Sequence, residues 1–224
     1  MEILIISDVH NDVENLMENM DKVALFNFDV IVFPGDFSDV PPKGFSSLDV
    51  SKIILEELKT FNKPILALPG NWDRDVISLL EEEKVSLHGH GKIIDDIGFY
   101  GFGGARTPFE TSFEPTEEEI EEGLEKAFKE VENVKVKVQV THAPPARTKL
   151  DVVYTGAHVG SEAVRKAIEK FKPVLAISAH IHEARGIDEI EGTKLINAGR
   201  FPEGYCGLAS IKNGKVEVKI INLI

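Results

Sequence analysis

Side chains that can bind metal ions follow five separate apolar runs of the chain. They are two aspartates, one asparagine and four histidines, namely Asp8, His10, Asp36, Asn71, His142, His180 and His182. Oxygen and imidazole donors without a thiolate suit Mn, Fe, Zn, Co or Ni better than a soft metal or an all-oxygen Ca or Mg site. Seven donors are too many for one four-coordinate ion, but they serve two divalent ions if one carboxylate is shared. A pair of ions about 3.5–4 Å apart activates water and holds the oxygens of a phosphoryl group during its displacement.

The runs that precede these side chains have strand character. They are short and mostly rich in β-branched residues, as buried strands are: Ile3–Ile6, Val30–Phe33, Ile65–Leu68, Val134–Val140 and Val174–Ile177. The carboxyl ends of strands in an open α/β sheet lie along one edge, where ligands bind. Residues two apart in an extended segment point the same way, so Asp8 with His10, and His180 with His182, can turn toward one place. We therefore expect the seven side chains to converge.

Helical patterns lie between several of these runs. Apolar residues recur at helical spacing over Val13–Ala24 and Ala163–Phe171, and a capping box at Thr116 predicts a helix over Thr116–Val131. Near the C-terminus, Asn213-Gly214 separates two further strand-like runs and predicts a hairpin. The residues alone therefore predict βαβ units in a mainly parallel sheet, followed by antiparallel strands.

Glycines mark points where the backbone leaves a strand. Gly35 and Gly70 allow it to turn sharply and to approach a site closely. The cluster Gly101–Gly104 lacks the Gly-Lys-Ser/Thr sequence of a phosphate-binding loop, so we assign it to a strand end near the metal edge.

Five motifs of this chain occur in the order and context of one known family. They are Asp8-x-His10, Gly35-Asp36-x-x-Asp39, Gly70-Asn71-x-Asp73, His142 and His180-x-His182. On these motifs the chain resembles the calcineurin-like metallophosphoesterases from residue 8 to residue 182. The resemblance implies an α/β fold, a four-layer αββα sandwich of two mixed β-sheets flanked by helices, with a two-metal site in the loops at one end. From its length we expect a single domain over residues 1–224.

The resemblance also assigns the metal ligands. One ion would be held by Asp8, His10, Asp36 and His182, and the other by Asp36, Asn71, His142 and His180, so that Asp36 bridges the two. The family's nucleophile is a metal-bound hydroxide, and Asp39 would lie just behind the ligands. His88 and His90 imitate a ligand pair but lie outside the family pattern, so we expect a turn between strands there.

Two residues depart from the family pattern. Ala179 replaces a glycine before His180, a change between small residues. Trp72 stands where many members have a histidine that stabilises the transition state or protonates the leaving group, and an indole has no titrating nitrogen for either task. General-acid help, typically about 10²–10⁴-fold, is therefore missing or comes from elsewhere. Trp72 is either an apolar wall that binds the substrate by stacking or a packing residue on the rim.

His158 is the candidate replacement for the missing acid. It precedes a predicted helix start at Ser161, where a capping or loop role is the alternative. Arg147 and Lys149 lie in a loop after His142 that should overhang the site. They either clamp phosphate oxygens as substrate-binding residues or remain solvated surface charges.

Composition narrows the class of protein. The 224 residues carry 25 basic and 38 acidic side chains, a formal charge of −13, which disfavours a general binder of nucleic acid or anionic membranes. Glu110–Glu125 contains eight glutamates and no lysine or arginine, so that stretch alone supplies −8. The single cysteine, Cys206, excludes an internal disulfide. The first residues lack the basic head of a signal peptide, so we expect a cytoplasmic protein without a membrane segment.

Together these features predict a metal-dependent phosphoesterase. It would hydrolyse a small phosphodiester or an activated phosphomonoester through a hydroxide bound at a two-metal site, with two divalent ions from among Mn, Fe, Zn, Co and Ni as cofactors. One alternative is a non-catalytic, metal-containing binding or scaffold module of the same fold, which Trp72 favours. The other is a nuclease, against which the length and charge count. The sequence leaves a homo-oligomer open.

Overall fold

Eleven strands and five helices make up the chain, and the computed structural model describes all residues, 1–224. The strands are β1 (Glu2–Ile5), β2 (Val30–Phe33), β3 (Ile65–Ala67), β4 (His90–Ile94), β5 (Ile97–Phe102), β6 (Val136–Thr141), β7 (Leu175–Ser178), β8 (Gly186–Ile190), β9 (Thr193–Asn197), β10 (Tyr205–Lys212) and β11 (Lys215–Asn222). The helices are α1 (Val13–Val23), α2 (Ser47–Lys59), α3 (Val76–Glu82), α4 (Glu117–Lys129) and α5 (Glu162–Phe171), with short 3₁₀ turns η1 (His182–Ala184) and η2 (Phe201–Glu203).

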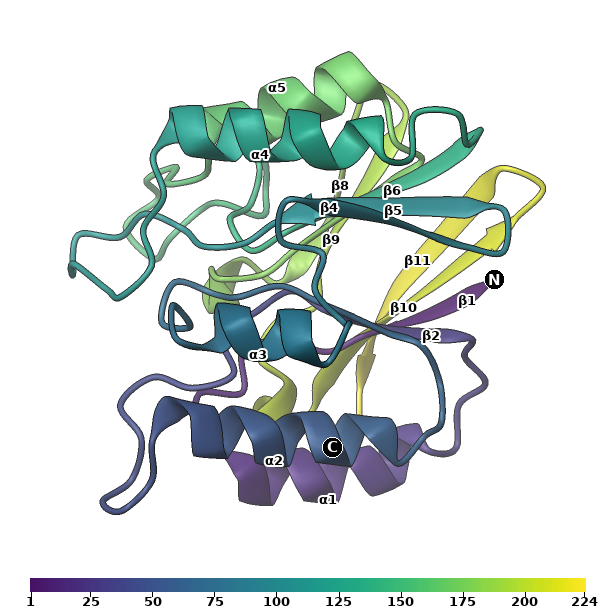
Figure 1. The fold of residues 1–224 in the computed structure, drawn as a ribbon. Helices are drawn as coiled ribbons and strands as arrows, with labels where there is room; N and C mark the ends of the chain where they lie inside the picture. Colours follow the sequence, from purple (N-terminus) through teal and green to yellow (C-terminus); the bar gives the residue numbers. More distant parts are fainter.

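Two β-sheets lie face to face at the centre, with helices on both outer sides (Figure 1). One sheet has the strand order β11-β10-β1-β2-β3, and the other has the order β4-β5-β6-β7-β9-β8. Both are mixed: β1, β2 and β3 are parallel while β10 and β11 pair antiparallel, and β5, β6, β7 and β9 are parallel while β4 and β8 are antiparallel edges. The predicted four-layer αββα sandwich is confirmed.

The alternation of side chains along β1 explains why two sheets and two helical layers are needed. Ile3 and Ile5 enter the core between the sheets, where they meet residues of the second sheet such as Phe99. Leu4 and Ile6 point the other way, into the core beneath the helices. Because successive residues of a strand face opposite sides and all four are fully buried, each sheet must be covered on both faces.

Each outer layer covers one sheet. The first layer, with α1, α2 and α3, packs on the β1 sheet through residues such as Leu16 of α1 and Ile54 of α2. The second layer, with α4 and α5, packs on the other sheet through residues such as Leu124 and Ile168. Figure 1 shows the two layers on opposite sides of the sheets. No helix of the chain combines the length and the apolar character that crossing a membrane would need.

Several predicted elements are present as expected. The helix at Thr116 begins with the predicted capping box, in which Thr116 and Glu119 exchange hydrogen bonds of 2.8 and 3.2 Å. The hairpin turn has positive φ at both Asn213 (52°) and Gly214 (74°), the conformation that this pair favours. The hairpin does not extend the parallel strands that precede it in sequence, because β10 returns to pair with β1 in the other sheet.

Candidate metal centre

Loops that follow β1, β2, β3, β6 and β7 meet at one end of the two sheets, at the left in Figure 1. Backbone hydrogen bonds join the first two loops: Asp8 N donates to Gly35 O at 3.1 Å and Val9 N to Asp36 O at 2.8 Å. A bond of 3.1 Å from Ala179 N to His142 O joins the loops after β6 and β7. The site is therefore built from the predicted strand ends, and loops from both sheets contribute to it.

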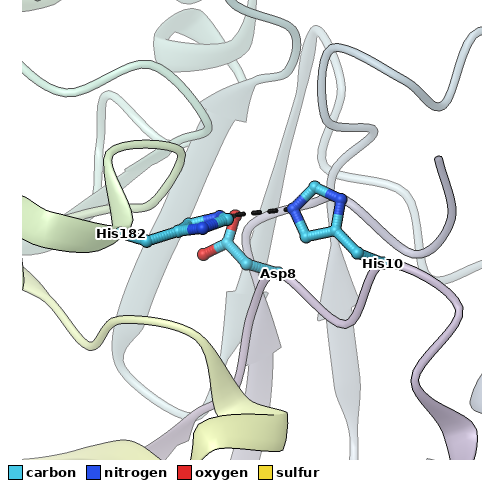
Figure 2. Close-up of side chains that lie close together, drawn as sticks. All are labelled: Asp8, His10 and His182. Carbon is cyan, nitrogen blue, oxygen red and sulfur yellow. Dashed lines mark hydrogen bonds and ion pairs between the residues drawn. The ribbon is translucent and has the colours of Figure 1, made fainter.

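Asp8, His10 and His182 form a first group, with ligand atoms within 4.8 Å of one another. Figure 2 shows these three side chains pointing toward one another. The two histidine Nε2 atoms lie 3.2 Å apart, and His182 Nε2 lies 3.5 Å from Asp8 Oδ1. Ser7 Oγ donates to Asp8 Oδ2 at 2.7 Å, which leaves the other carboxylate oxygen facing the histidine.

Asp36, His142 and His180 form a second group with the same spacing. His142 Nε2 lies 3.3 Å from Asp36 Oδ2 and 3.0 Å from Asn71 Oδ1, so the asparagine belongs to this group as well. Asp36 Oδ2 also lies 3.4 Å from His10 Nε2, in the first group. One carboxylate oxygen thus faces both groups, and the bridging role of Asp36 stays a prediction.

Four of the seven residues have a backbone conformation that side chains other than glycine adopt rarely. The φ angles are 56° at Asp8, 49° at His10, 57° at Asp36 and 72° at His180. Such positions are destabilising by roughly 1–3 kcal/mol each and persist only where the surroundings hold them. Four such residues in these neighbouring turns indicate that the backbone is strained where it holds the candidate ligands in place.

Two glycines let the turns after β2 and β3 come together. A Cβ at Gly35, whose φ is +111°, would lie 2.6 Å from Gly70 N, and a Cβ at Gly70 would lie 2.0 Å from Asp36 Oδ1. Neither position has room for a side chain, so the close approach that was expected of both glycines is present. Gly103, in the predicted strand-end cluster, likewise meets Pro69, since a Cβ there would lie 2.3 Å from Pro69 O.

The electrostatics of the site keep both aspartates ionised. Burial would raise the pKa of Asp8, but hydrogen bonding to His182 lowers it well below its usual range. Burial would likewise raise the pKa of Asp36, but the charge of His142 lowers it. Burial would lower the pKa of His142, but the charge of Asp36 raises it to about 9, whereas burial lowers the pKa of His180 to about 4.

This donor set fits divalent metal ions. In the neutral ring of His142, Nδ1 donates to Pro34 O at 2.8 Å, and Nε2 then faces only the acceptor oxygens of Asn71 and Asp36. A cation at that place would satisfy all three atoms. His10 and His182 present a similar pair of facing nitrogens, whose lone pairs one ion can accept together.

Comparison with known sequences identifies the family. The sequence model of the calcineurin-like phosphoesterases matches residues 1–184. The chain belongs to this family. Members of this family use divalent metals and act on phosphoester bonds, so two candidate metal groups at the strand ends are what a calcineurin-like phosphoesterase should contain.

This calcineurin-like phosphoesterase has similar proteins in several organisms. It is 35% identical over 219 residues to an uncharacterized protein of Methanocaldococcus jannaschii, and the match covers 95% of this chain and 94% of that one. A crystal structure of a Thermus thermophilus protein, TT1561, has a TM-score of 0.73 at 21% identity and covers 100% of this chain and 99% of the other. A novel archaeal phosphodiesterase has a TM-score of 0.57 at 17% identity, with 99% and 100% coverage. At these identities the two structures show a shared fold.

Two further predicted residues of this calcineurin-like phosphoesterase lie beside the metal groups. Asp39 Oδ2 lies 3.6 Å from His10 Nδ1. Trp72 donates its backbone N–H to Asp36 Oδ1 at 3.3 Å and lines a hollow together with His10 and His182. Both positions agree with the expectations for these residues, whose roles stay predictions.

Other predicted residues make their contacts outside the two metal groups. Arg147 pairs with Glu162 on the surface, with 59% of its side chain exposed. Lys149 reaches Asp188 at 4.0 Å and is more exposed still. His88 accepts a hydrogen bond of 3.1 Å from Gly103 N, and His90 begins β4, so neither joins a metal group.

Three residues of this calcineurin-like phosphoesterase gain a role that the sequence did not assign. Asp73 is fully buried and accepts hydrogen bonds from the backbone N–H groups of residues 37, 38 and 70, at 2.8–3.3 Å. Thr111 Oγ1 accepts a bond of 3.2 Å from Asn71 Nδ2, which turns the amide oxygen of Asn71 toward His142. Arg200 lines the same hollow as Trp72. Only Asp73 had a sequence signal, as the last position of its motif.

Proposed function

We propose that the protein is a metal-dependent phosphoesterase that hydrolyses small phosphodiesters or activated phosphomonoesters at a two-metal site. The observation that carries the proposal is the pair of three-residue groups, Asp8 with His10 and His182, and Asp36 with His142 and His180. When bound, two divalent ions activate water and neutralise charge on the phosphoryl oxygens. The chain's own task is to hold the donors in position, which the buried turns and their backbone bonds do.

Asp36 has the central part in this arrangement because its Oδ2 atom faces histidines of both groups. Its other oxygen accepts the backbone N–H of Trp72 at 3.3 Å, which fixes the orientation of the carboxylate. We therefore assign it as the residue shared by the two ions. Asp36→Asn should remove the shared charge and lower the metal content. The matched control is Asp21→Asn, which changes an exposed carboxylate without an ion pair. The control variant should bind as much metal as the wild type.

His158 is our candidate for the proton donor to the leaving group. Its Nδ1 lies 2.7 Å from Oδ1 of Asp151, a fully buried carboxylate that also accepts the N–H groups of Arg147, Thr148 and Gly160. A carboxylate held by three backbone donors fixes the tautomer of its histidine partner, so Nε2 becomes the nitrogen that gains and loses a proton. About half of the His158 side chain is exposed, which leaves it open to a substrate.

The loop that carries His158 is attached beside the first metal group. Tyr154 N donates to Glu183 Oε1 at 3.3 Å, and Glu183 follows His182 directly. Tyr154 and His182 also line one hollow. His158→Ala should lower kcat with the metal content unchanged, and Asp151→Asn should do the same because it releases the ring. An unchanged kcat in His158→Ala would remove His158 from the proposal.

The expected substrates are small and have good leaving groups. Loss of the family histidine at Trp72 matters least when the leaving group needs little protonation, so diesters and activated esters should react faster than alkyl monoesters. The formal charge of −13 argues against a groove that binds nucleic acid. We also propose that the protein acts in the cytoplasm. If alkyl monoesters prove the best substrates, the preference is wrong.

The function itself is tested by hydrolysis. Purified protein is stripped of metal, loaded in turn with Mn, Fe, Co, Ni or Zn, and incubated with p-nitrophenyl phosphate and bis(p-nitrophenyl) phosphate. We expect release of p-nitrophenol with at least one metal and none after chelation. Two bound ions per chain with no hydrolysis under any of these conditions would instead support a non-catalytic module of the same fold.

A further inference from the structure

Arg200 lies beside the first metal group although it follows none of the strands that carry the predicted ligands. It comes after β9, just before η2, and this segment is attached to the end of β1. Phe201 N donates to Ser7 O at 3.0 Å, and Ser7 Oγ lies 3.2 Å from Gly199 O as well as 2.7 Å from Asp8 Oδ2. The position of Arg200 is therefore fixed relative to a metal-binding aspartate.

Arg200 shares one hollow of about 360 Å³ with two residues of the first metal group, His10 and His182. Its lining consists of His10, Asp39, Trp72, His182, Arg200 and Glu203. A volume of that size is at the lower end of the range for small-ligand sites. A small anion that reaches the two histidines therefore lies within a space that Arg200 also borders.

The guanidinium of Arg200 has no hydrogen-bond partner in the protein. Only 25% of its side chain is exposed, and its buried Nε atom is unpaired. Its two nearest carboxylates are Asp12, 3.9 Å from Nη2, and Glu203, 3.7 Å from Nη1, both beyond hydrogen-bond length. By contrast, Arg165 donates to Glu169 at 2.7 Å and to a backbone carbonyl at 2.9 Å.

A largely buried arginine without hydrogen bonds retains its capacity to bind an anion. The two carboxylates at 3.7 and 3.9 Å hold the positive charge in place without saturating it. The planar fork of an arginine can donate two parallel hydrogen bonds to two oxygens of one phosphoryl group. A lysine would offer the same charge without this geometry.

We propose that Arg200 is a substrate-binding residue that donates two hydrogen bonds to the non-bridging oxygens of the phosphoryl group and leaves its loose ion pairs with Asp12 and Glu203 to do so. The proposal rests on the proposed phosphoesterase function. It adds to the hollow a cationic contact from the chain itself, supplied by the segment between β9 and β10, which carries none of the predicted metal ligands.

Titration calorimetry with inorganic phosphate tests the proposal on the Mn-loaded protein. Arg200→Gln should weaken phosphate binding by about 10- to 100-fold, the effect of losing hydrogen bonds to a charged group. Arg200→Lys should recover part of the affinity because it restores the charge only. Arg106→Gln, which removes an exposed arginine without an ion pair, is the matched control and should bind phosphate like the wild type. Wild-type affinity in Arg200→Gln at unchanged metal content would overturn the proposal.

Glu203→Gln decides the matter if Arg200→Gln does not fold. It keeps the guanidinium and removes its nearer carboxylate, so phosphate should bind several-fold more tightly than in the wild type. An unchanged or weaker affinity in Glu203→Gln would then overturn the proposal. Metal content and the melting temperature are measured for every variant, so that a lost metal is not mistaken for a lost phosphate contact.

Turnover separates this proposal from the proposed function. If the wild type binds phosphate through Arg200 but hydrolyses no ester, the phosphoesterase function fails and the binding site stands. If the wild type hydrolyses bis(p-nitrophenyl) phosphate and Arg200→Gln does so with the same KM, the function stands and the role of Arg200 fails. The combination we expect is a raised KM in Arg200→Gln with a smaller change in kcat.

Discussion

The turn after β3 leaves no space for a methyl group at Gly70. A Cβ there would lie 2.0 Å from Asp36 Oδ1 and 2.3 Å from Asp36 N. Carbon and oxygen atoms in contact are normally about 3.3–3.6 Å apart. In Gly70→Ala the distance between these atoms must therefore grow by roughly 1.3 Å or more, which displaces the Asp36 carboxylate from its present position.

A displacement of that size should affect both the metals and the reaction. A misplacement of about 1 Å at a reacting centre lowers rates by on the order of 10²-fold, and overpacking a buried site is destabilising by about 1–3 kcal/mol. For a chain of this size, 1 kcal/mol corresponds to a shift of about 2–4 °C in melting temperature. We expect Gly70→Ala to lose bound metal, to hydrolyse bis(p-nitrophenyl) phosphate at least about 100-fold more slowly, and to melt several degrees lower as the metal-free protein.

Gly186→Ala is the matched control for this prediction. A Cβ at Gly186 would meet only Leu150 Cδ2 at 3.4 Å and Ala184 O at 3.6 Å, which are ordinary contacts. The same glycine-to-alanine change should there leave metal content and activity as in the wild type. Metal content is measured by elemental analysis and melting by circular dichroism. A Gly70→Ala protein that keeps two ions per chain and wild-type activity would refute the reasoning that Gly70 sets the position of Asp36.

Three further substitutions test contacts around the site and in the core. The Asp73 carboxylate accepts hydrogen bonds from three backbone N–H groups, and Asp73→Asn places an amide N–H group against these donors. The substitution should lower the free energy of unfolding by about 1–3 kcal/mol in urea titrations. An unchanged urea midpoint would contradict this. Although burial opposes it, hydrogen bonds from Thr107 and Thr111 lower the pKa of Glu114 to about 2 from 4.5. The ionised carboxylate therefore contributes stability above pH 4.5 that is lost as the pH falls toward 2, so the stability difference between the wild type and Glu114→Gln should shrink over that range, and a constant difference would count against it. Tyr100→Phe removes a buried bond of 3.0 Å to an amide oxygen and should lower the free energy of unfolding by about 1–3 kcal/mol, which thermal melts can check against the wild type.

The convergence of the candidate ligands could be predicted from the sequence because it depends on strand ends; that they bind metal stays a prediction. Asp8 and His10 follow β1, and His180 and His182 follow β7, so a period-two pattern and the common edge of the strands were enough to bring them together. The shared position of Asp36 came from the family resemblance, and its oxygen does face both groups. What the pattern could not supply was the strained φ angles that aim these side chains, because they arise from contacts between neighbouring turns.

Residues outside the strand ends were harder to place. The contact between His158 and Asp151 depends on the path of the loop between them, for which residue spacing gives no rule. Arg200 carried no signal, since one arginine after Gly199 is indistinguishable from a surface charge in the sequence. Its lack of partners becomes evident only when every neighbouring acceptor has been placed.

The sequence signals for the remaining elements differ in strength. Helix α2 begins with a capping box of Ser46 and Asp49, so its start could have been recognised. Helix α3 is only seven residues long and has no side-chain cap bond, and short helices leave little periodicity. The hairpin of β8 and β9 turns through Glu191 and Gly192, both at positive φ, and a Glu-Gly pair is a weaker turn signal than Asn-Gly.

The turns that carry the two metal groups combine backbone strain with buried negative charge, and both effects destabilise the folded chain. Four residues at positive φ are destabilising by roughly 1–3 kcal/mol each, a sum comparable to the whole stability of a domain of about 5–15 kcal/mol. Two of these four residues, Asp8 and Asp36, are also fully or almost fully buried carboxylates, and although burial would raise their pKa values, the neighbouring histidines lower them. The backbone bonds between the turns after β1 and β2 offset part of the strain, but they do not neutralise the carboxylates. Divalent ions held by these side chains would neutralise the carboxylates directly and would bind the folded turns rather than the unfolded chain, so metal binding would most stabilise the residues that are least favourable for folding without it.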